Sequence, residues 1–293
     1  MSTPHPPIRH LASSRSGRRL AAAEFESNVH IWDIDNRKWV RSLHTRLDFG
    51  GERLAISADG GLCTVGSYND NSVACYAVDT AQELWRMKVQ HPQYVSFTPD
   101  DKRIVVSADN VCHILDRQDG STVNTFRHVH NVVESPWGLM TFLSGKQMEI
   151  RSVDRTARII PRETFAELAV AFSPQHVCVS ESAGPVRCFG LESGEELWRY
   201  DEREHHSVKL CYSPSEDAFL SVDLSYEREG AYKLLRFDAL SGQVQLVAAL
   251  RDAWEATFCL DGSCLVTAGG NIISTTTGAS VGQLWKTGET ARR

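Results

Sequence analysis

The sequence predicts an all-β fold that is assembled from a repeated unit of four short antiparallel strands. Three observations lead to this prediction. A turn followed by an apolar pair recurs roughly every 40 residues along the chain. Short apolar runs alternate with turn residues at intervals of about 8–12 residues. No stretch has the sustained apolar spacing of an amphipathic helix.

The recurring turn is a polar residue, a tight reversal that often contains Gly, and an apolar pair that often contains Trp. Its copies lie at residues 35–40, 79–85, 119–123, 192–198, 238–244 and 277–285. Trp39, Trp85, Trp198 and Trp285 fall at similar places in these copies. We expect all four to pack between neighbouring sheets, where each would bury about 150–250 Å².

A second pattern runs in step with the first and has the chemistry of a hairpin. A short apolar strand, a turn with Pro, Asp or Gly, and another apolar strand occupy 95–107, 171–180, 210–221 and 257–267. Four strands per period of about 40–45 residues indicate the blades of a β-propeller. We therefore expect one domain over 1–293 with seven blades of four antiparallel strands. The expected blades are 8–45, 47–90, 94–127, 132–164, 168–203, 207–250 and 254–286. Six blades with an insertion is the alternative, because the unit at 132–164 has irregular turns.

Composition excludes several classes of protein. The chain has 293 residues, a formal net charge of −6, 42% hydrophobic and 23% charged residues, which is ordinary for a soluble protein. No apolar run approaches the roughly 18 residues that span a bilayer, so we expect no membrane partner. The net acidity argues against a nucleic-acid-binding protein, which usually has clustered Lys and Arg.

The first 23 residues contain four Arg and no acidic residue. We expect a first hairpin with a basic turn, and an organelle transit peptide is the alternative. A secretory signal needs an apolar core that this segment does not have.

The eight cysteines lie mostly in apolar, strand-like runs and form no C-x-x-C pair. We therefore expect free thiols in a reducing cytoplasm, with a disulfide between Cys259 and Cys264 as the alternative.

The repeats resemble those of the WD40 family and of its quinoprotein-like propeller relatives. Ile31-Trp32-Asp33 ends a strand with the Trp-Asp of the family, whereas the Gly-His dipeptide of the family is absent. The endings at Leu84-Trp85 and Leu197-Trp198 look equally like the repeat of quinone-cofactor propellers. The resemblance covers nearly the whole chain and implies the fold more than the function.

A search for catalytic motifs finds no nucleophile elbow, phosphate-binding loop, zinc helix or calcium loop. His128 and His130 would lie on one side of an extended segment, yet two histidines are an incomplete metal site. We therefore expect neither a metal nor another cofactor.

The resemblance implies that the links between blades share a face with the loop between the second and third strands of each blade. Histidines and arginines are common in these links, and aromatic residues begin several units. Such residue types are favoured at binding hot spots, although polar loops also contain them by chance. The predicted partner-binding residues are Arg46, His91, Tyr94, His128, His130, Trp137, Arg203, His205, His206, Arg251 and Trp254. The predicted acidic rim around them is Glu24, Glu26, Asp70, Asp109, Glu181, Asp223, Glu227 and Glu229.

The function expected from these patterns is that of a non-catalytic protein–protein interaction module, a scaffold or adaptor that binds a protein or peptide on its loop-lined face. A stand-alone inhibitor or immunity-type protein that blocks one basic partner is a special case, which the acidic balance would suit. We expect a monomeric chain that can join a complex. The alternative is a propeller enzyme that uses the central channel, either a quinone-dependent dehydrogenase or a hydrolase. Binding of nucleic acid or phosphoinositide is a third hypothesis.

Overall fold

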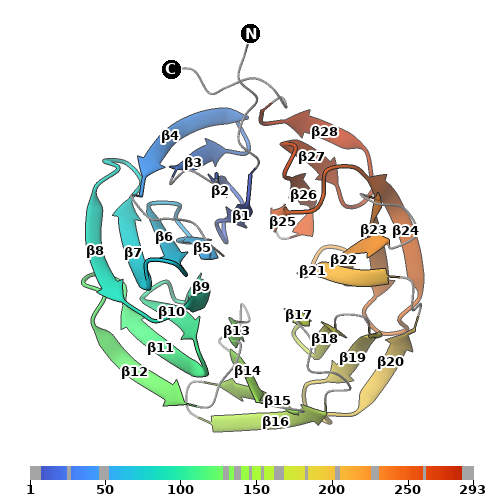
Figure 1. The fold of residues 1–293 in the computed structure, drawn as a ribbon. Coiled ribbons are helices and arrows are strands. Elements are labelled where there is room, and N and C mark those ends of the chain that lie inside the picture. The colour runs from blue at the N-terminus through green and yellow to red at the C-terminus, as the bar shows by residue number, and fades with distance from the viewer. Residues whose placement is uncertain are drawn as a thin grey trace. The chain divides into compact units, whose positions relative to one another are not determined.

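The computed structural model describes residues 8–24, 28–45, 53–127, 132–134, 140–144, 147–152, 155–161, 168–181, 184–201, 205–225, 231–259 and 262–285. These residues form 28 β-strands, which pair into seven four-stranded sheets in chain order (Figure 1). The all-β class and the four-stranded antiparallel repeat are thereby confirmed. The sequence predicted seven blades, with six as the alternative, and the structure has seven four-stranded sheets.

The first four sheets have the following strands. Sheet 1 consists of β1 (His10–Ser13), β2 (Arg19–Ala23), β3 (Asn28–Asp33) and β4 (Lys38–His44). Sheet 2 consists of β5 (Arg53–Ile56), β6 (Leu62–Ser67), β7 (Ser72–Ala77) and β8 (Glu83–Lys88). Sheet 3 consists of β9 (Pro92–Phe97), β10 (Arg103–Ala108), β11 (Val111–Asp116) and β12 (Thr122–Arg127). Sheet 4 consists of β13 (Val132–Glu134), β14 (Met140–Ser144), β15 (Gln147–Ser152) and β16 (Arg155–Pro161).

The last three sheets repeat this order. Sheet 5 consists of β17 (Leu168–Phe172), β18 (His176–Glu181), β19 (Val186–Gly190) and β20 (Glu196–Tyr200). Sheet 6 consists of β21 (His205–Ser213), β22 (Ala218–Ser225), β23 (Ala231–Asp238) and β24 (Val244–Leu250). Sheet 7 consists of β25 (Ala256–Cys259), β26 (Cys264–Thr267), β27 (Asn271–Ser274) and β28 (Ser280–Gln283).

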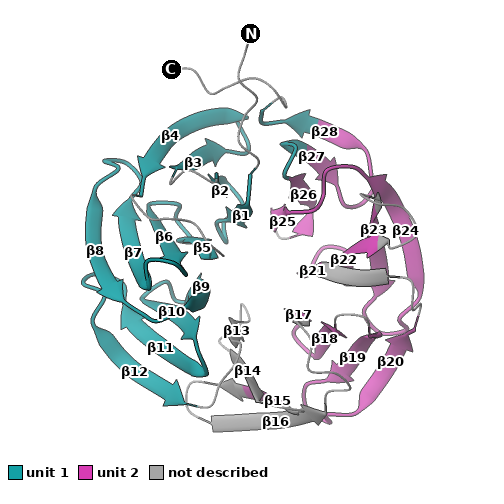
Figure 2. Cartoon of the chain, viewed as in Figure 1, with its two compact units in different colours: residues 1–134, 268–271, 282–293 teal, residues 135–267, 272–281 magenta. Residues whose placement is uncertain are grey.

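The chain divides into two compact units (Figure 2). Unit 1 comprises 1–134, 268–271 and 282–293, and unit 2 comprises 135–267 and 272–281. The described part of the chain contains no helix that is long and apolar enough to cross a membrane.

The position of a strand within its sheet explains its burial. The second strands are almost continuously buried, as in β10, where only Arg103 is exposed. The fourth strands are mostly exposed, as in β12, where Phe126 alone is half-buried. An inner strand has a hydrogen-bonded neighbour on each side and a packed layer on each face, so its sequence is an unbroken apolar run. The first hairpin follows the sequence prediction, since His10 pairs with Ala23 in the β1–β2 register.

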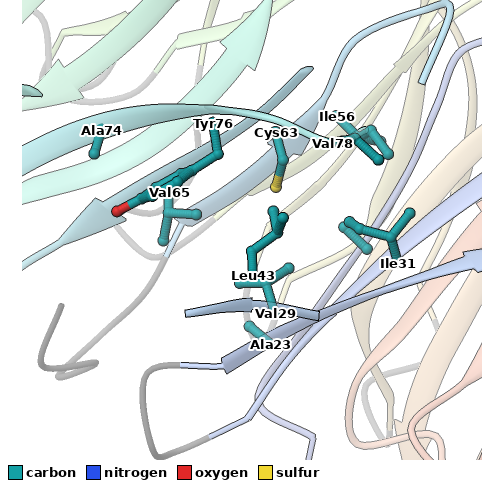
Figure 3. Close-up of a cluster of buried hydrophobic side chains, with 11 residues drawn as sticks. Ala23, Val29, Ile31, Leu43, Ile56, Cys63, Val65, Ala74, Tyr76 and Val78 are labelled. Carbon is teal, nitrogen blue, oxygen red and sulfur yellow. The ribbon is translucent and has the colours of Figure 1, made fainter. Parts of the chain in front are cut away.

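Unit 1 contains a core between the facing surfaces of sheets 1 and 2 (Figure 3). Most of its members are small or branched, and Tyr76 is the one aromatic residue among them: Ala21, Ala23, Val29, Ile31, Leu43, Ile56, Cys63, Val65, Ala74, Tyr76 and Val78. The Tyr76 hydroxyl donates to the Thr45 carbonyl at 2.7 Å, which satisfies the polar atom of this buried side chain. Burial is the largest cause that raises the pKa of Tyr76 above its usual value.

Aspartates in the turns explain the recurring polar residue of the repeat. The Asp238 carboxylate accepts the backbone N–H of Ser241 at 2.7 Å and that of Leu240 at 3.2 Å. Asp59 likewise accepts the Ser57 hydroxyl at 2.6 Å and the Gly61 N–H at 2.9 Å. These hydrogen bonds stabilise the charged form and lower the pKa of both carboxyls.

Two tryptophans pack between neighbouring sheets, as predicted. Trp85 on β8 donates its Nε1–H to the Arg117 carbonyl at 2.9 Å, and Trp198 on β20 donates to the Ala239 carbonyl at 3.0 Å. Both carbonyls belong to the turn between the third and fourth strands of the next sheet in the chain. Both indoles are almost fully buried.

Each of these indoles lies directly under a turn glycine. A Cβ on Gly120 would lie 2.5 Å from the Trp85 ring, and one on Gly242 would lie 2.6 Å from the Trp198 ring. Both glycines also have positive φ, 71° and 69°. The Gly of the repeat therefore makes room for the Trp of the preceding repeat, in addition to providing the left-handed turn.

Trp39 does not hold this position, and the prediction for it is wrong. Trp285 packs against a neighbouring sheet as predicted, but through the Trp32 ring of sheet 1 rather than under the turn of the next sheet. Trp39 is 40% exposed and pairs with Trp32, on the turn side of a register shift in β4. Trp285 follows the end of β28, donates its Nε1–H to the Ala268 carbonyl at 3.2 Å and contacts the Trp32 ring at 5.4 Å. The pair Leu-Trp is common to the copies that contain Trp85, Trp198 and Trp285, whereas the spacing from the left-handed turn residue differs among them. That spacing is four residues for Trp198, counted from Gly194, and seven for Trp285, counted from Gly278.

All eight cysteines are free. Cys259 and Cys264 are direct partners in the β25–β26 register, as are Cys178 and Cys188 in β18–β19. Burial raises the pKa of Cys188 to about 12 and raises that of Cys178 as well. These thiols therefore behave as small apolar side chains of the core.

Candidate functional site

Three short connections of unit 1 meet at one place. They are the turn between β6 and β7, the link between β8 and β9, and the turn between β10 and β11. His91 joins them, because its backbone N–H donates to the Asn71 side-chain oxygen at 2.9 Å and its Nδ1 lies 2.6 Å from the Asp109 carboxylate. At His91, the link between sheets 2 and 3 therefore lies at the same end as the loops between the second and third strands of these sheets, as the resemblance to WD40 repeats implied.

The backbone is left-handed at four residues of these three connections. The φ angles are 50° at Asn71, 44° at His91, 31° at Asp109 and 66° at Asn110. Asn, Asp and His tolerate this region better than other non-glycine residues. The residue types at these four positions therefore follow from the backbone that the turns require.

The His91 imidazole is oriented by two neighbours. Asp109 holds Nδ1, and the Tyr68 ring stacks on the imidazole with centroids 4.4 Å apart and planes 20° apart. The Tyr68 side chain is 40% exposed, and His91 and Asp109 are also open to solvent. We call Tyr68, His91 and Asp109 the Tyr–His–Asp cluster.

The chemistry of the Tyr–His–Asp cluster suits recognition. Because the carboxylate holds Nδ1, a ligand meets the imidazole at Nε2, which accepts a hydrogen bond when neutral and donates one when protonated. The exposed face of the Tyr68 ring adds an apolar surface with a polar tip. An exposed ion pair of this kind contributes only about 0–1 kcal/mol to stability, so the fold does not depend on it.

Charges of both signs surround the Tyr–His–Asp cluster. The Asp70 carboxylate accepts the Ser67 hydroxyl at 2.7 Å, and the Lys88 ammonium lies 3.4 Å from the Asp70 carbonyl oxygen. Arg127, at the end of β12, pairs with Val111, which directly follows the β10–β11 turn. The mixed signs favour a ligand that is read by individual hydrogen bonds rather than by net charge.

The predicted partner-binding residues fall into two groups within the described part of the chain. His91 and Tyr94 belong to unit 1, where Tyr94 is half-buried on β9 opposite Ser107. Arg251 and Trp254 belong to unit 2, where both are exposed on the link between β24 and β25. His205 and His206 begin β21 and pair with Ser225 and Leu224. Arg46, His128, His130, Trp137 and Arg203 lie outside the described residues.

Sequence reasoning missed Tyr68 and Asn71 as members of the site. Both lie in the stretch 66–72, which is longer than a tight turn requires. That length was a usable signal, because long loops on a rigid scaffold often bind ligands. The stacking of Tyr68 on His91 is a contact between sheets, and no local pattern reports it.

A second histidine, His30 on β3, takes part in a more buried set of contacts. Its Nδ1 lies 2.6 Å from the Ser42 hydroxyl, and its Nε2 lies 3.0 Å from the Glu24 carboxylate. Glu24 directly follows β2, His30 lies on β3 and Ser42 lies on β4, so these contacts connect neighbouring strands of sheet 1. The Glu24 and His30 side chains are largely shielded from solvent, so we assign them to stabilising the sheet. Among the described residues, no group of three or more His, Cys, Asp or Glu side chains is placed to hold a metal ion.

Comparison with known proteins gives the fold. No family model matches the chain, and no curated protein matches it by sequence. Among solved structures, Kuenenia stuttgartiensis hydrazine synthase is similar with a TM-score of 0.74 at 15% identity, over 94% of this chain and 98% of that one. The structure titled U3-55K is similar with a TM-score of 0.69 at 13% identity, over 89% of this chain and 87% of that one. Identities this low show the fold alone, which is an all-β propeller of four-stranded antiparallel sheets.

Proposed function

We propose that this chain is a non-catalytic interaction module, a WD40-like propeller that binds a protein or peptide partner through the loops at the ends of its sheets. The observation that supports this proposal is the Tyr–His–Asp cluster, an exposed aromatic ring stacked on an oriented imidazole. Tyrosine is enriched at binding hot spots because it offers a large contact area with few rotatable bonds. The cluster lies on loops that two sheets hold in place, which is a common location for recognition.

The test compares three versions of the chain as bait in a lysate of the native cell. The wild type, a double variant Tyr68→Ala with His91→Ala, and the control Trp39→Ala are each checked for folding by thermal melting. Trp39 is a matched control, because it is an aromatic residue of the same unit with the same 40% exposure as Tyr68. A partner that the wild type and Trp39→Ala retain and the double variant loses supports the proposal.

The size of the effect is part of the test. With the partner identified, loss of a hot-spot aromatic residue should raise the dissociation constant by about 30-fold or more, which corresponds to about 2 kcal/mol. An unchanged dissociation constant for the double variant would rule out this cluster as the binding site. A double variant Arg251→Ala with Trp254→Ala tests the predicted partner-binding residues of unit 2 in the same way.

The same proposal includes a cytoplasmic location and, as a special case, a stand-alone inhibitor or immunity-type protein that blocks one partner. Eight free cysteines, seven of them buried, support a reducing compartment. The net charge of −6 supports a basic partner, which would associate faster at low salt. The alternative enzyme function stays a prediction. Ser42, His30 and Glu24 have the residue types of a catalytic triad, but the burial of His30 and Glu24 restricts a substrate from reaching them.

A further inference from the structure

Sheet 1 is basic, although the chain as a whole is acidic. Residues 8–45 contain seven Lys and Arg against four Asp and Glu, so they carry a formal charge of +3. The rest of the chain carries −9, which gives the net charge of −6. The other six blade ranges expected from the sequence carry between −3 and +1. A ligand that the acidic remainder repels can therefore be attracted to sheet 1 alone.

The positive charge is concentrated at one end of sheet 1. The β1–β2 turn and the β3–β4 turn share this end, because each closes an antiparallel hairpin of the same sheet. The Ile34 N–H donates to the Arg18 carbonyl at 2.9 Å, which holds the two turns side by side. The described residues of this end include five basic and two acidic side chains: Arg15, Arg18, Arg19, Arg37 and Lys38, with Asp33 and Asp35. We call Arg15, Arg18, Arg37 and Lys38, which are all exposed, the basic turn patch.

The two carboxylates of this end leave most of the positive charge open to a ligand. The Asp33 carboxylate lies 3.0 Å from the Arg19 guanidinium, outside the basic turn patch, and it also accepts the Asn36 N–H at 2.8 Å. Asp35 lies 3.9 Å from Arg18, whose side chain is 76% exposed. An exposed pair at this distance is weak, so a ligand carboxylate competes with it at little cost.

Arg37 has a backbone conformation that arginine rarely adopts. It lies four residues after the end of β3 and has a φ of 53°. At the same place, sheet 2 has Ala81, and four other described turns have a glycine with positive φ: Gly120, Gly194, Gly242 and Gly278. A left-handed φ costs free energy in any residue except glycine, and such strain is common where a side chain has a function. The turn itself favours glycine, so the reason for an arginine lies in its side chain.

The Arg37 guanidinium is oriented by a second glycine of unit 1. A Cβ on Gly282 would lie 2.7 Å from Arg37 Nε and 2.8 Å from Arg37 Cζ, so the planar group lies against the backbone of this glycine. Arg37 is nevertheless exposed. A guanidinium that is oriented in advance loses less conformational entropy on binding, and its fork matches the two oxygens of a carboxylate.

We propose that the basic turn patch binds an acidic segment of a partner protein, through hydrogen-bonded ion pairs with its Asp and Glu carboxylates. The charge around the patch favours a short segment over a nucleic acid. The β5–β6 turn lies against Arg19 and brings Asp59 to the border of the patch, and residues 47–90, which include this turn, carry −3. A long polyanion that continues past the patch therefore meets like charges, whereas a few carboxylates contact the patch alone.

The basic turn patch is separate from the Tyr–His–Asp cluster. The patch lies on turns that join first to second and third to fourth strands, whereas the turns of the cluster join second to third strands. In an antiparallel sheet these two kinds of turn lie at opposite ends of the strands. The acidic segment is therefore a second ligand, and its binding does not depend on the function proposed above.

Fluorescence anisotropy of the full chain with labelled hexaglutamate tests this proposal. Labelled hexaglutamine and a labelled six-nucleotide thymidine strand are the comparison ligands. At about 20 mM NaCl the wild type should bind hexaglutamate at least about 10-fold more tightly than either, and binding should weaken as NaCl rises to about 200 mM. The double variant Arg18→Gln with Arg37→Gly should bind hexaglutamate at least about 10-fold more weakly. It should still fold, since glycine is the residue that four other turns have at this place, and thermal melting checks this.

The matched control is the double variant Lys102→Gln with Arg103→Gln. It removes the same two positive charges from exposed positions of sheet 3 in the same unit, and its affinity for hexaglutamate should stay within about two-fold of the wild type. Equal weakening by both double variants would mean that only net charge matters, and it overturns the proposal. A wild type that does not bind hexaglutamate overturns it as well. Tighter binding of the thymidine strand than of hexaglutamate also overturns it and assigns the patch to nucleic acid.

Discussion

Replacement of Trp198 by Ala should cost about 4 kcal/mol of unfolding free energy, within the range of about 3–5 kcal/mol for a buried aromatic residue. Only 8% of Trp198 is exposed. Its ring stacks on Phe237 with centroids 5.7 Å apart, and its Nε1–H donates to the Ala239 carbonyl at 3.0 Å. The variant therefore loses buried area, an aromatic contact of about 1 kcal/mol and a hydrogen bond of about 1 kcal/mol, and leaves a cavity.

The glycine above this indole provides a second, independent part of the prediction. Gly242→Ala in the wild type places a Cβ 2.6 Å from the Trp198 ring, at a φ of 69°. The left-handed φ alone costs about 1 kcal/mol, and the clash adds about 2 kcal/mol. In the Trp198→Ala background the ring is gone, so Gly242→Ala should cost only about 1 kcal/mol. The two substitutions should therefore be coupled by about 2 kcal/mol.

Urea unfolding followed by far-UV circular dichroism measures both quantities, with Trp39→Ala as the control. Trp39 is 40% exposed, and its loss should cost less than about 1 kcal/mol. A cost below about 1 kcal/mol for Trp198→Ala would refute the packing argument. Equal costs for the two tryptophan variants, or no coupling between Trp198 and Gly242, would refute it too.

Two further predictions concern single side chains. Hydrogen bonds from Ser241 lower the pKa of Asp238 in the folded chain. The charged carboxylate therefore stabilises the fold above the unfolded pKa of about 3.9. This stabilisation is lost as the pH falls through the lower pKa of the folded chain. The melting temperature of Asp238→Asn should therefore lie below that of the wild type at pH 7, and the difference should close below about pH 4; a difference that persists at pH 2 contradicts this. Cys211 is the one cysteine of the eight that is not buried. A thiol reagent should therefore modify the native chain quickly at Cys211 and not in Cys211→Ser, and fast modification of other thiols would show that the sheets open.

The repeat could be read from the sequence because each unit encodes its own turns. Asp59 and Asp238 sit where a carboxylate caps the amides of a tight reversal, and the apolar runs between such turns have the length of strands. These are local requirements, satisfied within a few residues. They therefore predicted an all-β fold of four-stranded sheets without knowledge of any contact between sheets.

The positions of the tryptophans could not be read in the same way. Leu84-Trp85 and Leu284-Trp285 look alike in the sequence, yet only Trp85 lies under the turn of the next sheet. Trp85 lies four residues after the left-handed residue Ala81 and within β8, whereas Trp285 lies seven residues after the left-handed Gly278 and beyond the end of β28. The position of a residue in the strand register fixes the direction of its side chain, so the two tryptophans meet different neighbours.

The candidate site likewise combines features that the local sequence predicts with contacts that only the folded chain forms. The sequence by itself determined the strand repeat, the polar turns and the presence of His91 on a link between sheets. Only the tertiary structure decided that Tyr68 and Asp109, 23 and 18 residues away in the chain, hold the His91 ring. The physical reason is that turn chemistry acts between adjacent residues, whereas stacking and ion pairs depend on how neighbouring sheets bring distant loops together.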